Sequence, residues 1–86
     1  MSYTTIHTIE IDGHAVAEYW ISSCDAPAKP ERKKTAILAM LARALISEAT
    51  SGDSGMTMLD TELAEEYLER IACGEDFTIR ERGAII

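Results

Sequence analysis

The chain has few residues that could cross-link a small protein, and it has no long apolar run. Its 86 residues include only two cysteines, Cys24 and Cys73, which are too few and too far apart for a disulfide framework. The longest nearly uncharged apolar stretch, 35–46, is too short to cross a bilayer. The polar N-terminus lacks the basic start and apolar segment of a secretory signal. We therefore expect a cytoplasmic protein with reduced thiols and no membrane association.

Motifs for catalysis and cofactor binding are also missing. The sequence contains no P-loop, no Gly-x-Gly-x-x-Gly and no Gly-x-Ser-x-Gly. The chain has four candidate zinc ligands, which is the number that a zinc site needs, but they do not form the closely spaced pairs that zinc sites use. They are His7, His14, Cys24 and Cys73. Glutamates on a solvated surface do not make a hydrolase, because paired catalytic carboxylates need a cleft and unequal environments. We expect no enzymatic activity, no cofactor and no metal.

What the chain does contain is enough apolar material for one small folded domain. Hydrophobic residues make up 47% of the sequence and charged residues 27%, which is typical of globular rather than disordered proteins. A core of this size leaves only a small margin of stability, so self-association is a reasonable expectation. We expect a single domain over residues 1–86.

The segment 3–22 is predicted to form a β-hairpin. Its β-branched and aromatic residues flank Asp12-Gly13, a dipeptide that favours a two-residue type I′ turn. Such a turn would place Val16 opposite Ile9 and Trp20 on the same core face. It would also place Glu18 opposite His7 on that face, and a cross-strand surface pair is the simpler interpretation of this couple than a catalytic dyad.

Two helices and a strand are predicted after the hairpin. Pro30 suits the first turn of a helix over 30–50, whose apolar face includes Leu38, Leu41, Leu45 and Ile46. A break with two glycines precedes a second helix over 57–73, with Gly74 placed to end it. Alternation then predicts a strand over 77–82. The order ββααβ indicates an α+β fold with both helices on one face of a small sheet.

The net charge of −7 is confined to residues 53–76, which hold eight acids and only Arg70 as a base. Glutamates at the spacing of one helical face would line the second helix opposite its apolar side. One interpretation is a solvated helix face without a binding role. The other is a functional surface that binds a basic partner or imitates nucleic-acid phosphates. Direct DNA binding by this face is disfavoured by its charge. The candidate partner-binding residues are Asp53, Asp60, Glu62, Glu65, Glu66, Glu69, Glu75 and Asp76.

A second charged cluster gathers near the start of the first helix, where positive charge opposes the helix dipole. Glu66, Glu69 or Glu75 could neutralise it if the two helices lie antiparallel. The alternative is a small phosphate or nucleic-acid patch, although four bases without interleaved aromatic residues are a weak signal. The cluster consists of Lys29, Arg32, Lys33 and Lys34.

Residues 68–83, with the sequence LERIACGEDFTIRERG, resemble the helix, Gly-Glu turn and strand near the front of Phd/YefM-type antitoxins. The match covers under a fifth of the chain. It departs from the family in its position along the chain and in lacking a basic dimer surface. A second hypothesis is a small homodimeric, antitoxin-like DNA-binding regulator, for which the basic cluster at 29–34 would supply the DNA contacts and Ala36, Ala39 and Arg43 a dimer surface.

Our leading hypothesis is a non-enzymatic interaction protein that presents its acidic helix to a basic surface of another protein. In size, acidity and lack of catalytic motifs the chain is similar to small phage-encoded inhibitors of host machinery, including anti-CRISPR proteins. Such a protein would block the nucleic-acid-binding site of its partner. A third possibility is a structural or assembly subunit in which the hairpin end with Ile6, Tyr19 and Ile21 pairs with a neighbouring strand.

Overall fold

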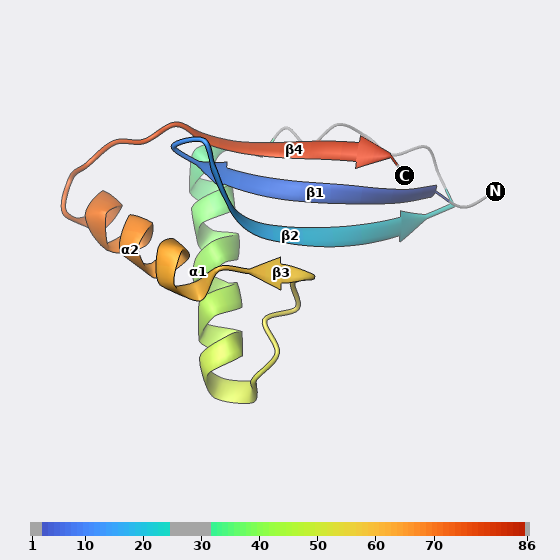
Figure 1. Cartoon of the computed structure of the whole chain (residues 1–86), viewed down its shortest axis with the longest axis horizontal. Helices are drawn as coiled ribbons and strands as arrows, with labels where there is room; N and C mark the ends of the chain where they lie inside the picture. The colour runs from blue at the N-terminus through green and yellow to red at the C-terminus, as the bar shows by residue number, and fades with distance from the viewer. Residues whose placement is uncertain (1–2, 25–31, 86) are drawn as a thin grey trace.

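The computed structural model describes residues 3–24 and 32–85, and it confirms a small α+β fold (Figure 1). Four strands form one antiparallel sheet in the order β3-β2-β1-β4, and the chain order is ββαβαβ. The elements are β1 (Tyr3–Ile11), β2 (His14–Ser23), α1 (Lys34–Ser51), β3 (Met58–Leu59), α2 (Thr61–Ala72) and β4 (Ile79–Ile85).

The hairpin forms as predicted, but its register does not follow from its turn. Asp12 and Gly13 have positive φ angles of 53° and 79°, as a type I′ turn requires. Ile9 then pairs with Ala17 instead of Val16, because a β-bulge places one extra residue in β2. The bulge directs both Val16 and Ala17 into the core, where both are fully buried.

The bulge also reverses which residues of β2 face the helices. The predicted pair of His7 with Glu18 is wrong, since His7 lies opposite Tyr19 and Glu18 lies opposite Thr8. Trp20, expected in the core, is 54% exposed. A shift of one residue exchanges the two faces of a strand, so every expected pair beyond the bulge changes.

Both helices contribute to one core on the inner face of the sheet. Ile9 and Ile11 alternate inward on β1 and meet Leu41 of α1 and Tyr67 of α2. Helix α1 runs across the strands behind the sheet in Figure 1, whereas α2 lies near the hairpin turn. Ile46, expected on the apolar face of α1, is 61% exposed, because the buried side of that helix follows Ile37, Leu41 and Ala44.

The ends of the elements follow from local chemistry. Gly52, with a φ of 74°, ends α1 by donating its N–H to the carbonyl of Glu48. Asp60 caps α2 by accepting the N–H of Leu63 at 3.1 Å. The second helix is shorter than predicted, because Met58 and Leu59 leave the helical pattern and pair with β2 as β3. Pro30 lies outside the described residues, and α1 begins at Lys34.

Candidate functional site

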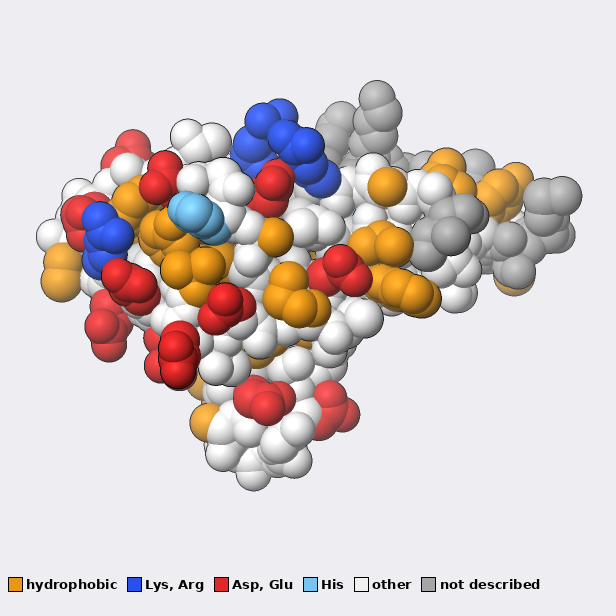
Figure 2. Space-filling view, viewed as in Figure 1, with side chains coloured by type: hydrophobic (Ala, Val, Ile, Leu, Met, Phe, Trp, Pro, Cys, Tyr) orange, Lys and Arg blue, Asp and Glu red, His pale blue; other side chains and the backbone are white. Residues whose placement is uncertain are grey.

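Helix α2 carries four exposed glutamates opposite its buried side. Ala64 and Tyr67 are buried in the core and Leu63 and Leu68 pack partly buried against it, so the glutamates on the other side of the helix face solvent. We refer to the four glutamates as the acidic face, and Figure 2 shows acidic side chains gathered over this end of the molecule. The acidic face consists of Glu62, Glu65, Glu66 and Glu69.

The four carboxylates of the acidic face make no ion pair within the described part of the chain. Arg70, on the same helix, pairs instead with Glu75, through contacts of 2.8 and 2.9 Å. This hydrogen bonding from Arg70 lowers the pKa of Glu75. The charge of the acidic face is therefore left for solvent or a partner.

The other four predicted acidic residues are exposed, but each has a local role. Asp60 caps α2, and Asp53 accepts the N–H of Gly55 at 2.9 Å in the loop that follows α1. Asp76 pairs with Lys34, and that hydrogen bond lowers the pKa of the carboxyl group. Glu75 and Asp76 are thus held in ion pairs, whereas Asp53 and Asp60 accept backbone N–H groups and, like the acidic face, make no ion pair among the described residues.

The basic cluster near the start of α1 is engaged mainly within the molecule. Arg32 donates hydrogen bonds of 2.8 and 3.1 Å to the two carboxylate oxygens of Glu81 and a further one to the hydroxyl of Tyr19. Lys34 pairs with Asp76, which follows α2, instead of with the expected Glu66, Glu69 or Glu75. Lys33 is exposed at the N-cap of α1, and Lys29 lies outside the described residues.

A buried polar cluster on the inner face of the sheet was not predicted. The side chain of Glu81 is only 1% exposed, and it accepts a hydrogen bond of 2.9 Å from the Tyr19 hydroxyl as well as those from Arg32. The ring of His7 stacks on Tyr19 with 4.9 Å between centroids, and its Nδ1 lies 3.8 Å from Glu81 Oε2. A signal was present, because Glu81 follows Ile79 at an inward position of β4.

This cluster has the character of a structural network. Both oxygens of Glu81 already accept hydrogen bonds, so the carboxylate is poorly placed to accept a proton from a substrate. Burial is the main cause that raises the pKa of Tyr19, and the hydrogen bond from Arg32 acts against it. His7 Nδ1 is buried and has no hydrogen-bond partner among the described residues.

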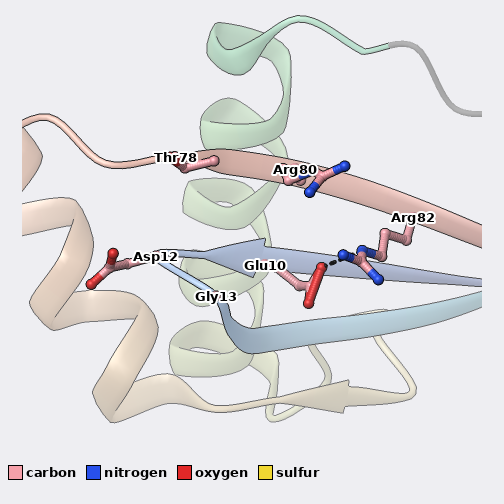
Figure 3. A pocket seen from close by; sticks show the side chains of 6 residues that line it. All are labelled: Glu10, Asp12, Gly13, Thr78, Arg80 and Arg82. Atoms are coloured by element: carbon pink, nitrogen blue, oxygen red, sulfur yellow. Dashed lines mark ion pairs between the residues drawn. The ribbon is translucent and has the colours of Figure 1, made fainter.

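The outer face of the sheet has a shallow hollow of about 290 Å³ near the hairpin turn (Figure 3). Glu10 and Arg82 face each other there and form an ion pair of 2.7 Å, while Asp12 points away from the arginines. This pairing neutralises much of the charge in the hollow. The six lining residues are Glu10, Asp12, Gly13, Thr78, Arg80 and Arg82.

Within residues 3–24 and 32–85, no group of three or more histidine, cysteine, aspartate or glutamate residues is arranged to hold a metal ion. In the same part of the chain, neither helix has the length and apolarity needed to cross a membrane. No protein-family model, curated protein or solved structure matches the chain, so its function is inferred from its own surface chemistry.

Proposed function

We propose that the protein is a non-enzymatic interaction module whose acidic face binds a basic surface on another protein. The observation that carries this proposal is the contrast between the two charged clusters. Arg32 and Lys34 are paired with the protein's own carboxylates, whereas the four glutamates of the acidic face have no ion pair among the described residues.

The acidic face has the properties that electrostatic recognition requires. Its side chains project from a helix that Ala64 and Tyr67 anchor in the core, so a partner meets a fixed row of carboxylates. Concentrated negative potential raises the association rate with basic surfaces and disfavours acidic ones. A basic surface that normally binds nucleic acid is a suitable partner, because carboxylates can occupy the positions of phosphates. Bound there, the protein would act as an inhibitor or regulator of that partner.

The alternative, direct DNA binding by the basic cluster, has less support. Two of its four bases already neutralise internal carboxylates, and a phosphate would have to compete with these pairs. Lys33 is exposed, but a single lysine on a chain with a net charge of −7 offers little net attraction for a polyanion.

The proposal is tested by affinity capture with two variants of equal charge. In the first, all four glutamates of the acidic face become glutamine. In the second, Glu10, Glu18 and Glu48 become glutamine and Asp12 becomes asparagine. Each variant loses four negative charges from −7, so both have a net charge of −3. Tagged versions are used to capture proteins from the cells in which the gene occurs.

We expect the wild type and the second variant to capture the same basic protein, and the first variant to lose it. Nucleic acid added to the captured complex should release the partner from the tagged protein, because nucleic acid and the acidic face compete for the same basic surface of the partner. Equal capture by both variants would contradict the proposal, as would capture of acidic proteins alone.

A further inference from the structure

The two edges of the sheet differ in how they are protected from pairing. Natural edge strands are shielded by charge, proline, bulges or short length. The edge strand β4 carries the exposed side chains of Arg80 and Arg82. On the opposite side β3 covers only Ala17 and Glu18 of β2, so residues 19–23 have no strand partner on that side among the described residues. This segment, which we call the open edge, has no charged residue and no proline.

The hydrogen bonds of β2 define which backbone N–H and C=O groups of the open edge face away from β1. Thr57 donates its N–H to the carbonyl of Glu18 at 2.8 Å, so the backbone of Glu18 faces away from β1. Because the direction alternates along an antiparallel strand, the N–H and C=O groups of Trp20 and Ser22 face the same way. An extended chain with matching groups is the structure that can pair with them.

The side chains near the open edge are unusually apolar for a solvent-facing surface. Trp20 is 54% exposed, Ile21 41% and Met58, in the neighbouring β3, 36%. The indole of Trp20 donates to the carboxylate of Glu18 at 3.0 Å, which links the ring to the strand. Apolar residues beside unpaired backbone groups mark this edge as a surface for strand addition.

We propose that two copies of this chain pair through their open edges, antiparallel, with Ile21 on the twofold axis. In this register the backbone N–H and C=O groups of Trp20 in each copy face those of Ser22 in the other copy. The two pairs together give about four hydrogen bonds. The large indole lies opposite a small hydroxymethyl group. Ile21 meets its own copy in a non-hydrogen-bonded pair, where side chains approach most closely.

A second copy of the chain fits the open edge because this edge is uncharged and because the twofold pairing gives a closed dimer. The chain repels itself through its net charge of −7, but the excess of acids over bases lies at 53–76, and residues 19–23 of the open edge carry no charge. In Figure 1 helix α2 lies at the far end of the molecule from the tip of β2. Pairing of like edges about a twofold axis occupies the open edge of both copies, so the assembly closes as a dimer. This inference does not depend on the acidic face.

A cysteine cross-link tests the register directly. Ile21→Cys is made with Cys24→Ser and Cys73→Ser, because both native thiols are exposed. Under mild oxidation by copper–phenanthroline, we expect most of the chain to become a disulfide-linked dimer. Ile85→Cys in the same background is the control, since this residue is 64% exposed at the end of β4 and should form little dimer. Equal cross-linking at both positions, or none at position 21, would overturn the proposal.

Sedimentation equilibrium supplies a second readout. We expect the wild type to show twice the mass of the chain at high concentration, and Ile21→Lys to show the mass of one chain. Circular dichroism checks that this variant is folded. Ile46→Lys, which alters another exposed isoleucine, should keep the dimer mass. A wild type that stays monomeric up to its solubility limit would overturn the proposal, as would an Ile21→Lys variant that stays dimeric.

Discussion

Arg32 and Glu81 are 49 positions apart in the sequence, yet the guanidinium of Arg32 reaches both carboxylate oxygens of Glu81, at 2.8 and 3.1 Å. Arg32 precedes α1, and Glu81 is in the last strand. The contact therefore joins the approach of the first helix to the edge of the sheet. Because the Glu81 side chain is 1% exposed, its charge is tolerable only with these donors in place.

Replacement of Glu81 by glutamine should destabilise the fold by about 1–3 kcal/mol. The substitution keeps the shape of the side chain but leaves Arg32 without its counter-charge and weakens the hydrogen bond from Tyr19. Urea unfolding measures the change. The control is Glu10→Gln, which removes a more exposed ion pair with Arg82 and should cost less than about 1 kcal/mol. Equal losses in both variants would show that Glu81 has no special structural role.

Tyr19 should ionise above the ordinary tyrosine pKa of 10.0, chiefly because burial disfavours its charged form. Its contribution to stability should be fully present below pH 10.0 and should be lost as the pH rises through the higher pKa of the folded state. The absorbance of tyrosinate, compared between wild type and Tyr19→Phe, isolates this group from the other tyrosines. A difference titration centred at or below pH 10.0 would contradict the assignment.

The buried side of α1 can be tested with two substitutions on the same helix. Leu41 is fully buried, so Leu41→Ala should cost about 2–5 kcal/mol through lost apolar contact and a cavity. Ile46 is 61% exposed, so Ile46→Ala should change stability by no more than about 0.5 kcal/mol. Thermal melts of both variants give the comparison. A large loss at Ile46 would indicate that a second surface covers this side of the helix.

The features that the sequence predicted well depend on short-range chemistry. The type I′ turn at Asp12-Gly13 and the outward direction of the α2 glutamates each follow from a few neighbouring residues. The fold class followed from the order of these elements.

The features that the sequence did not predict depend on contacts across the fold. Val16 and Ala17 carry no signal that distinguishes a bulge from a regular strand, and the bulge then changed each later pair in β2. Alternation after Ile79 indicates that Glu81 points inward, but its partners come from both hairpin strands and the approach to α1, so no local pattern could identify them. Strand β3, only two residues long, was hidden in the start of a predicted helix.

The central claim is that the acidic face binds a basic surface. Isothermal titration of the captured partner with wild type, the acidic-face variant and the variant of equal charge tests this claim most directly. We expect the acidic-face variant to lose at least about tenfold in affinity, which corresponds to about 1.4 kcal/mol, while the control stays close to wild type. Equal losses in both variants would show that only net charge matters, and unchanged binding of the acidic-face variant would contradict the claim.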